Sequence, residues 1–378
     1  MKVNFFAPVN NLGYGIHAYN TMLAFEKLGH EVVLIAPFGV IAEGFPRTIE
    51  WLAGRSNVNA KDPGVMIFCD QYLMQFAGRP RVGFPVFEMD VFTPVQKAMM
   101  KSCDFLLTPT RWGLQTMIEN GIDRDRIRVV HEGFDPGIFT FRNKSEADLA
   151  ERPFTFINVG KFELRKGTIQ AIECFFRALE GESAALILHV SNPFIKDYSE
   201  MEKTLLNIGF KASSDNMDWR RAGLTIHFSN TVTRHEEIAA LYARADCGLF
   251  PTRAEGWGLP ILESLATGMP CITGRWTGMS EYIPNYYPEE LILKNPMKQT
   301  AYDGLWFLGD VGTWNVPTDG ELINAIRWAF KNVRALRVTE IWRSQVEDIR
   351  YFTWNSAAKM LENAMVEFCQ KAESDNGK

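Results

Sequence analysis

Short apolar runs alternate with helical patterns along this chain, and the alternation happens twice. The first series starts with a strand-like run at 3–7 and a helical pattern at 16–28, and the second starts with 154–159 and 168–179. Strands that alternate with helices are typical of parallel sheets with right-handed crossovers. Two such series predict an α/β fold of two Rossmann-like domains that face each other across a cleft.

A polar and charged segment, 142–152, separates the two series and is followed by Pro153. Such a segment is typical of an interdomain linker. We therefore expect an N-terminal domain over residues 1–150 and a C-terminal domain over residues 151–345. The tail, 346–378, is predicted to be helical.

The composition narrows the class of protein. With 46% apolar and 22% charged residues, the 378-residue chain is typical of a soluble globular protein. The 40 Lys and Arg are balanced by 45 Asp and Glu, which argues against nucleic-acid binding or a polybasic membrane contact. No apolar run approaches the roughly 18 residues of a membrane span. The six cysteines lack C-x-x-C spacing, which favours reduced thiols. We expect a soluble, cytoplasmic protein.

The stretch from Glu255 to Glu263, E-G-W-G-L-P-I-L-E, follows an apolar run at 247–250. Pro260 suits the first turn of a helix and Gly268 suits its end. The sequence therefore predicts a strand, a glycine loop and a helix in that order. Free N–H groups and the helix dipole at such a start favour an anion such as a phosphate.

Two acids accompany this predicted anion site. Glu255 is expected in the loop that faces it, and Glu263 about one turn inside the helix. An ionised carboxylate only accepts hydrogen bonds, so each acid suits the paired hydroxyls of a sugar or ribose. Gly256 and Gly258, on either side of Trp257, allow a tight turn and a close approach by another group. The pattern indicates a ligand in which a sugar is attached to a phosphate.

A basic loop is the second signal. Residues 159–167 read V-G-K-F-E-L-R-K-G and place Lys161, Arg165 and Lys166 between a predicted strand and a predicted helix. Lysine is a compact charge that suits phosphate. The charge of a diphosphate leaving group must be offset by metal ions or by a positive clamp. The sequence offers such a clamp and no convincing metal site, and a solvated basic loop is the alternative.

Gly13 and Gly15 belong to a G-x-G-x-x-A loop, which formally matches a dinucleotide-binding fingerprint. A dehydrogenase is disfavoured because the next strand ends in I-A-P at 35–37, where an acid should hold the ribose. Two interpretations stay open. The loop either only starts a helix, or its backbone approaches a ligand.

Two further acids, Glu88 and Asp90, follow the predicted strand at 81–86. Open α/β sheets bind ligands at this edge, but a solvated acid or a helix cap is an equal alternative. Asp123 and Asp125 form a D-x-D pattern in a helix-to-strand connection, where we predict a solvated turn.

Taken together, these motifs resemble the retaining, nucleotide-sugar-dependent glycosyltransferases of the GT-B fold, family 4. The E-x7-E pattern of Glu255 and Glu263 is the signature of that group. The basic loop is similar to its G-R-F…K-G segment, with Lys161 where arginine is usual. The N-terminal glycine loop, H-E-G-F-D at 131–135 and F-T-W at 352–354 also resemble family segments. The likeness is specific in the C-terminal half and loose in the N-terminal half.

The resemblance implies a role for each motif. Glu263 is expected to bind the ribose hydroxyls, and Glu255 the donor sugar near its reacting face. Lys161 and Lys166 are expected to bind the diphosphate. Further donor contacts are implied for Gly13, Gly15, Gly256, Trp257, Gly258 and Leu259.

Many members of the family also place a histidine near the sugar from the N-terminal domain. Here the corresponding segment reads F-E-M-D, similar to the F-E-x-D variant of some members, and makes Glu88 and Asp90 catalytic candidates. His17, in the glycine loop, is a further candidate, but a histidine without a role at a helix start is at least as plausible.

The resemblance implies a reaction. The protein is expected to move a sugar from a nucleoside-diphosphate sugar to an acceptor hydroxyl with retention, without a metal or cofactor. The N-terminal domain would bind the acceptor, and the last helix would cross back to it. The acceptor stays open among a glycan, a lipid, a metabolite and modified DNA. A GT-B phosphorylase, an epimerase and a non-catalytic sugar-nucleotide-binding protein are the alternatives.

Overall fold

The computed structural model describes residues 1–37, 39–41, 43–69, 72–74, 76–141, 152–194, 198–230, 232 and 234–376. Most of the predicted linker, 142–151, lies outside the described residues. The descriptions that follow concern the described ranges.

The first sheet contains only parallel strands, as the first series of alternating elements predicts. Its order is β2-β1-β3-β4-β5-β6. The strands are β1 (Lys2–Phe6), β2 (Glu31–Ile35), β3 (Gly64–Phe68), β4 (Arg81–Pro85), β5 (Phe105–Thr108) and β6 (Ile127–Val129). Successive side chains point to opposite faces, so Phe5 and Phe6 enter two different hydrophobic clusters, one on each face.

Helices connect these strands. They are α1 (Gly13–Lys27), α2 (Thr48–Ala53), α3 (Pro94–Lys101) and α4 (Arg111–Glu119), with 3-10 turns η1 (Gly54–Asn57) and η3 (Arg124–Arg126). The short α2 and η1 were not predicted. The D-x-D pattern is an exposed turn in which the Asp125 N–H donates to the Asp123 carboxylate, as predicted.

The second sheet is mixed. Its order is β14-β13-β12-β7-β8-β11-β10-β9. The strands are β7 (Phe154–Lys161), β8 (Ala184–Ser191), β9 (Lys211–Ala212), β10 (Asp218–Arg221), β11 (Leu224–Phe228), β12 (Cys247–Phe250), β13 (Cys271–Gly274) and β14 (Ile292–Leu293). The parallel strands β7, β8, β11, β12 and β13 were predicted, whereas β14 and the antiparallel edge strands β9 and β10 were not.

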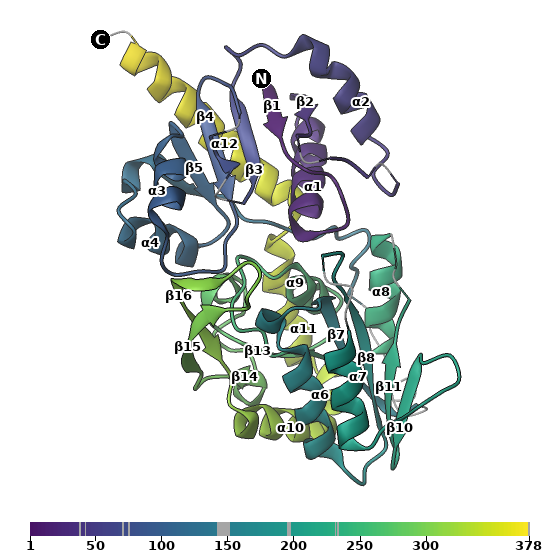
Figure 1. Cartoon of the computed structure of the whole chain (residues 1–378). Helices are drawn as coiled ribbons and strands as arrows, with labels where there is room; N and C mark the ends of the chain where they lie inside the picture. The colour runs from purple at the N-terminus through teal and green to yellow at the C-terminus, as the bar shows by residue number, and fades with distance from the viewer. Residues whose placement is uncertain are drawn as a thin grey trace.

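Helices again connect the strands of this sheet, and more helices follow it. They are α6 (Thr168–Leu179), α7 (Ser199–Ile208), α8 (His235–Arg244), α9 (Leu259–Ala266), α10 (Asp319–Arg337) and α11 (Glu340–Glu347), with 3-10 turns η4 (Leu164–Lys166), η5 (Thr277–Glu281), η6 (Glu289–Leu291) and η7 (Asp348–Tyr351). Figure 1 shows this half below the N-terminal half.

The order of the strands locates three glycine-containing segments, which follow β1, β7 and β12. In the first sheet the chain reverses direction across the sheet at β1, and in the second it does so at β7, which lies between β12 and β8. Ligands of open α/β sheets bind outside the carboxyl ends of the strands at such switch points. The loop after β1 carries Gly13, and the loops after β7 and β12 carry Lys166 and Glu255. All three therefore lie where this topology favours a ligand.

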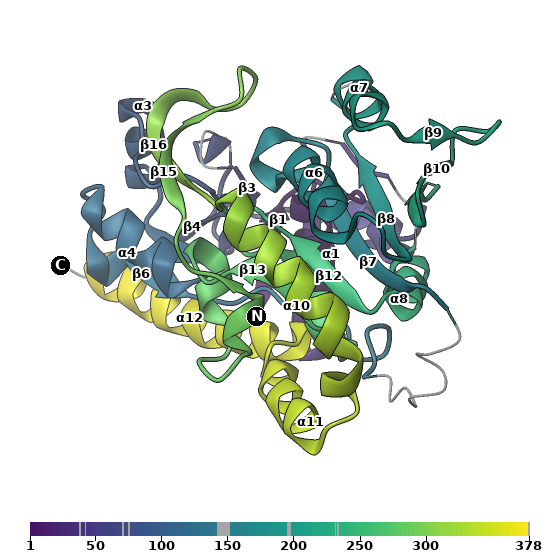
Figure 2. The same ribbon diagram turned by 90° about the horizontal axis from the view of Figure 1, so that it is seen from below.

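A hairpin of the C-terminal half packs on the N-terminal half. It consists of β15 (Met297–Tyr302) and β16 (Leu308–Val316), and the sequence analysis did not predict it. Phe307 and Trp314 belong to the hydrophobic cluster formed by the α3 and α4 face of the first sheet. Figure 2 shows the hairpin at one side of the molecule, beside α3 and α4.

The last helix, α12 (Trp354–Asn376), lies on the N-terminal half and packs against α1 (Figure 1). The ring of Phe368 stacks on that of Phe105 at 4.2 Å between centroids. Glu367 forms an ion pair with Arg128. The chain thus passes between the halves twice.

The two segments of the chain that connect the halves form hydrogen bonds with each other. The N–H of Phe134 donates to the carbonyl of Phe352 at 3.1 Å, and the N–H of Trp354 donates to the carbonyl of Phe134 at 3.3 Å. A Cβ added at Gly133 would lie 2.4 Å from the backbone nitrogen of Trp354. Glycine is required here because two backbones meet.

We expect Gly133→Ala to lower the free energy of unfolding by about 2 kcal/mol or more, because the clash is with backbone that cannot rotate away. Urea unfolding followed by circular dichroism measures this change. Gly137→Ala is the matched control, since its Cβ would only approach the movable Asp135 carboxylate, at 3.1 Å. Equal midpoints for the two variants would contradict the close crossing at Gly133.

Candidate functional site

The loop after β12 and the start of α9 have the predicted structure. Gly258 precedes α9 with a φ of 93°, a left-handed conformation that favours glycine, and Pro260 lies in the first turn. Gly268 ends the helix region with a φ of 78°, and its N–H donates to the carbonyl of Leu265 at 2.9 Å. The local sequence therefore determines this turn and this helix.

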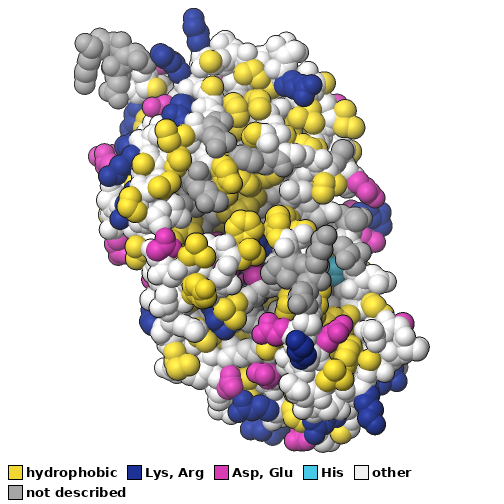
Figure 3. All heavy atoms as spheres, viewed as in Figure 1, with side chains coloured by type: hydrophobic (Ala, Val, Ile, Leu, Met, Phe, Trp, Pro, Cys, Tyr) yellow, Lys and Arg dark blue, Asp and Glu magenta, His cyan; other side chains and the backbone are white. Residues whose placement is uncertain are grey.

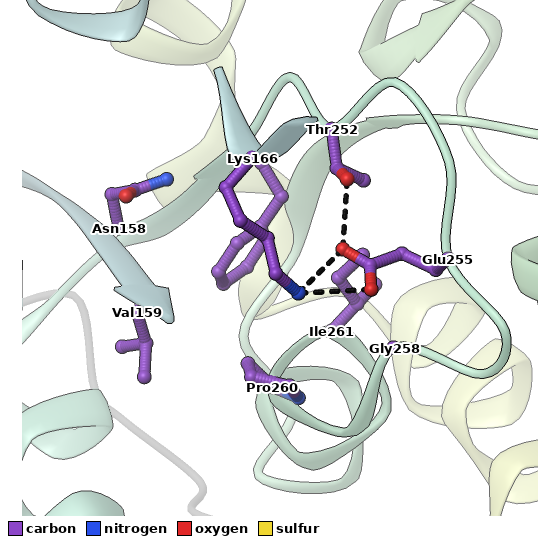
Figure 4. A pocket seen from close by; sticks show the side chains of 9 residues that line it. Asn158, Val159, Lys166, Thr252, Glu255, Gly258, Pro260 and Ile261 are labelled. Carbon is purple, nitrogen blue, oxygen red and sulfur yellow. Dashed lines mark hydrogen bonds and ion pairs between the residues drawn. The ribbon is translucent and has the colours of Figure 1, made fainter. Parts of the chain in front are cut away.

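Glu255 lines a small pocket formed by β7, the loops after β7 and β12, and the start of α9. Lys166 Nζ is 2.7 Å and 2.8 Å from its two carboxylate oxygens, and Thr252 Oγ1 donates to Oε1 at 2.7 Å (Figure 4). The pocket is lined by Asn158, Val159, Lys166, Phe250, Thr252, Glu255, Gly258, Pro260 and Ile261. The structure thus brings together Lys166 and Glu255, which lie 89 residues apart in the sequence.

Arg165 is the buried centre of the charge network, and the sequence analysis gave it no individual role. Its guanidinium donates to Glu255 Oε2 at 3.0 Å and to the carbonyl of Ala254. It also forms ion pairs with Glu163, at 2.5 Å, and with Glu88, at 3.3 Å. Planar arginine can bind several acceptors at once, so one side chain connects three carboxylates. A sequence signal for this role is an arginine whose own loop contains a glutamate, while a second loop next to an apolar run contains another glutamate.

The positive charges of the basic loop are paired with carboxylates. Lys161 lies 3.2 Å from Glu163, and its side chain is 33% exposed. Lys166 and Arg165 both contact Glu255. The cations expected to bind a diphosphate are therefore already paired with carboxylates, and a bound phosphate would share them.

The ionisation of Glu255 follows from its surroundings. Burial alone would raise the pKa of this carboxyl, but Lys166, Arg165 and the Thr252 hydroxyl lower it to about 2. Glu255 is therefore a stable anion at neutral pH, held in a fixed orientation by three donors.

Glu263 differs from Glu255 although both lie in the same motif. It is buried in α9, and burial raises its pKa to about 8, against a small opposing effect of the Tyr242 hydroxyl at 3.5 Å. The carboxyl is therefore mostly protonated at neutral pH and can donate as well as accept. The sequence analysis treated both acids as ionised, and the burial that separates them was not visible in the motif.

Gly256 and Trp257 have packing partners. A Cβ at Gly256 would lie 2.4 Å from Val86 Cγ1 and 2.9 Å from the carbonyl of Phe87, so the predicted close approach is made by the N-terminal half. The Trp257 side chain is buried, with its ring 5.6 Å from that of His131 and 5.8 Å from that of Phe352. Leu259 is buried as the first residue of α9.

The side chains of Glu88 and Asp90 lie at different places in the structure. Glu88 lies at the network, 3.3 Å from Arg165, and burial raises its pKa despite that arginine. The carboxylate of Asp90 accepts from the N–H and the hydroxyl of Thr313, at 2.9 Å and 3.1 Å. Asp90 thus binds β16 and is absent from the pocket lining around Glu255 within the described chain.

The two glycines of the N-terminal loop also differ. A Cβ at Gly15 would lie 2.3 Å from the backbone nitrogen of Asn10, so the first turn of α1 packs closely on its own loop. Gly13 begins α1, is exposed and has no atom within 4 Å of an added Cβ. Only Gly13 therefore has free space beside it.

Metal-ligand clusters and membrane-spanning helices are both absent from the described ranges. These ranges contain no group of three His, Cys, Asp or Glu side chains placed as metal ligands would be. They also contain no helix with the length and apolarity that crossing a membrane requires.

Comparisons with known proteins agree with this architecture. Residues 140–305 match the family model described as "Glycosyl transferases group 1". A D-inositol 3-phosphate glycosyltransferase of Pseudarthrobacter chlorophenolicus is 27% identical over 172 residues, which cover 43% of this chain and 37% of that relative. The chain therefore spans well under half the length of this relative.

Solved structures cover nearly the whole chain. A sucrose-phosphate synthase of Thermosynechococcus elongatus superposes with a TM-score of 0.68 and 16% identity, covering 97% of this chain and 98% of the other. Anabaena HepE in complex with UDP and glucose superposes with a TM-score of 0.64 and 14% identity, covering 97% and 100%. These likenesses confirm the predicted GT-B fold.

The raised pKa of Glu263 predicts a pH-dependent effect of Glu263→Gln. A carboxyl whose pKa is higher in the folded than in the unfolded protein stabilises the fold fully at a pH below its pKa in the unfolded chain. This contribution is lost as the pH rises to the pKa in the folded protein, which is about 8 for Glu263. Relative to the wild type, the glutamine variant should therefore gain stability from pH 5 to pH 8, by at most about 1.4 kcal/mol per pH unit. Thermal unfolding across this range measures the gain.

Glu43→Gln, at an exposed glutamate, is the control and should follow the wild type at every pH. A constant difference between Glu263→Gln and the wild type from pH 5 to pH 8 would contradict the raised pKa.

Proposed function

We propose that this chain, whose residues 140–305 match the model of glycosyl transferases group 1 and which has a GT-B fold, is a retaining glycosyltransferase that uses a nucleoside-diphosphate sugar. The observation that carries the proposal is the buried contact of Glu255 with Lys166 and Arg165 beside the start of α9. A fixed anion and two cations thus lie beside the start of α9, whose helix dipole favours negative charge there. A sugar attached to a diphosphate has hydroxyls and negative charge that match this set.

In this proposal the donor lies along the loops after β7 and β12. Its diphosphate binds at the start of α9 and shares Lys161 and Lys166 with Glu163 and Glu255. The ribose hydroxyls contact Glu263, whose protonated carboxyl can both donate and accept. Glu255 accepts hydroxyls of the donor sugar. Anabaena HepE, whose structure contains UDP and glucose, supports this class of donor.

The chemical step would need few protein groups. The acceptor hydroxyl attacks the anomeric carbon on the face of the leaving group, and the departing phosphate takes the hydroxyl proton. Lys161, Lys166 and the dipole of α9 would stabilise the charge that develops on the phosphate, so the proposed reaction is independent of metal. The contact of Gly256 with Val86 and Phe87 helps to exclude water from this region.

Nucleotide binding tests the proposal. We expect one of UDP, GDP, ADP and dTDP, with EDTA present, to raise the melting temperature. A ligand at about 100 times its Kd adds about 2.7 kcal/mol of stability, which differential scanning fluorimetry detects. No shift with any nucleotide, with or without magnesium, would contradict a nucleotide-sugar enzyme.

Variants of the basic loop extend this test. Lys166→Met should reduce the affinity for the stabilising nucleotide by about tenfold or more, because a charge-assisted hydrogen bond to phosphate is lost. Lys298→Met removes an exposed lysine of β15 and is the control. Titration calorimetry at constant ionic strength compares the two variants. Equal affinities would exclude Lys166 from the phosphate site.

A further inference from the structure

The turn that joins β15 to β16 exposes several large apolar side chains, namely Tyr302, Leu305, Trp306 and Leu308. Trp306 at the centre of the turn is 51% exposed. Neighbouring apolar side chains that face solvent together often mark a binding site. The pocket around Glu255 is lined by other residues, so the donor site leaves this turn without a role.

Hydrogen bonds close the turn and hold its backbone in place. Asp303 Oδ1 accepts from three consecutive N–H groups, those of residues 305–307, at 2.8, 2.8 and 2.9 Å. The N–H of Asp303 donates to the carbonyl of Phe307 at 2.9 Å. Phe307 is buried, with its ring 4.8 Å from that of Trp314, in the cluster on the first sheet. The exposed Trp306 is therefore presented by a fixed turn that is anchored on the N-terminal half.

A second exposed ring, from a distant segment, contacts Trp306. Phe194 follows β8 and is 55% exposed, and its ring lies 5.5 Å from that of Trp306 with 80° between the planes. The Phe194 N–H donates to Oδ1 of Asn192 at 3.0 Å, and the Asn192 amide donates to the carbonyl of Phe162 at 3.0 Å. Two nearly perpendicular rings, Trp306 and Phe194, thus form an aromatic corner at the surface.

The aromatic corner is connected to both sides of the candidate site. On the side of the C-terminal half, Phe162 belongs to the basic loop and follows Lys161 directly. On the side of the N-terminal half, the indole N–H of Trp314, on which Phe307 packs, donates to the carbonyl of Glu88 at 3.2 Å. Short series of direct contacts therefore join the corner to the basic loop and to the segment of Glu88.

The chemistry of the aromatic corner favours a sugar ring. The faces of aromatic rings are negative, and the C–H groups on one face of a sugar ring are slightly positive, so the two faces pack together. The hairpin contains two acids, Asp303 and Asp310, and a single cation, Lys298. This balance disfavours an anionic lipid surface, which attracts basic segments, whereas carboxylates accept hydrogen bonds from sugar hydroxyls.

We propose that Trp306 and Phe194 form a subsite for a sugar ring of the acceptor, so that the acceptor is a saccharide or a molecule that carries one. Trp306 packs on one face of the sugar, and Phe194 closes the corner beside it. This inference rests on the proposed function, because it concerns the acceptor of that reaction. It narrows the acceptors that the sequence left open to those with a sugar.

Fluorine NMR of the protein labelled with 5-fluorotryptophan tests where a sugar binds. The chain has 10 tryptophans, and the resonance that is missing from the spectrum of Trp306→Phe identifies Trp306. The probes are methyl α-glucoside, methyl α-mannoside, methyl α-galactoside and N-acetylglucosamine, each titrated to millimolar concentrations without nucleotide. We expect at least one probe to shift the Trp306 resonance in a saturable way.

Variants then test the two rings, with the Kd of that probe measured by saturation-transfer difference NMR. Trp306→Ala should weaken binding by about tenfold, because the stacking face is lost. Trp306→Tyr keeps an aromatic face and should stay within about threefold of the wild type, and Phe194→Ala should fall between the two. The Kd of the stabilising nucleotide should be unchanged in Trp306→Ala.

Ile341→Ala is the matched control, since it also removes an exposed apolar side chain, 67% exposed, from α11. Figure 2 shows α11 at the opposite end of the view from the turn between β15 and β16. This variant should bind the probe as the wild type does. Thermal unfolding of each variant checks that the fold is intact.

The outcomes separate this inference from the proposed function. If nucleotides bind but no probe shifts the Trp306 resonance, or Trp306→Ala keeps the full affinity for the probe, the inference is overturned and the proposed function stands. Failure of every nucleotide to bind the wild-type protein would overturn the proposed function and, with it, the acceptor role of the corner.

Two other occupants of the aromatic corner would also overturn the inference. A lipid surface is the occupant if no probe binds and Trp306→Ala abolishes cosedimentation of the protein with phosphatidylcholine vesicles. A second copy of this chain is the occupant if no probe binds and Trp306→Ala converts a dimer into a monomer in sedimentation velocity.

Discussion

The burial of Arg165 among three glutamates is the interaction on which the candidate site depends. A buried guanidinium is tolerated only when carboxylates and carbonyls satisfy it. Glu163 comes from the same loop, Glu255 from the loop after β12, and Glu88 from the N-terminal half. Removing any one of the three would leave part of the charge of the buried Arg165 side chain, which is 4% exposed, without its partner. The network therefore fixes the relative positions of three segments that are far apart in the sequence.

This network also explains why the two glutamates of one motif differ in chemistry. Glu255 has two cations and a hydroxyl around it, so burial does not prevent its ionisation. Glu263 lies about one turn inside α9, where its partner is the Tyr242 hydroxyl, and burial raises its pKa to about 8. One motif thus supplies a fixed anion and a neutral hydrogen-bonding group, which suits a ligand with both sugar and ribose hydroxyls.

The two halves of the chain are joined by packing as well as by charge. The β15–β16 hairpin places Trp314 in the hydrophobic cluster of the first sheet, and its indole N–H donates to the carbonyl of Glu88 at 3.2 Å. On another side, α12 places Leu361 and Phe368 in the core of the same sheet. Figure 3 shows hydrophobic side chains gathered over the region where the halves meet. The C-terminal half therefore packs on both faces of the first sheet, and the hairpin holds the segment that carries Glu88.

The sequence by itself determined the local elements. Periodicity located the parallel strands, and Pro260 and Gly268 located α9, because these signals act within a few residues. It did not predict β15 and β16, since an antiparallel hairpin in an irregular segment lacks a strong local pattern, and its strands are stabilised by packing on the other half. It placed Glu88 and Asp90 as equivalent candidates.

Only the tertiary structure distinguished these side chains. Asp90 binds Thr313 of β16, whereas Glu88 reaches Arg165. The buried pair of Glu132 and His17 emerged in the same way, from two residues 115 positions apart whose contact no local pattern encodes. Ion pairing and burial are properties of neighbours in space, so they decide protonation and partners only after the chain has folded.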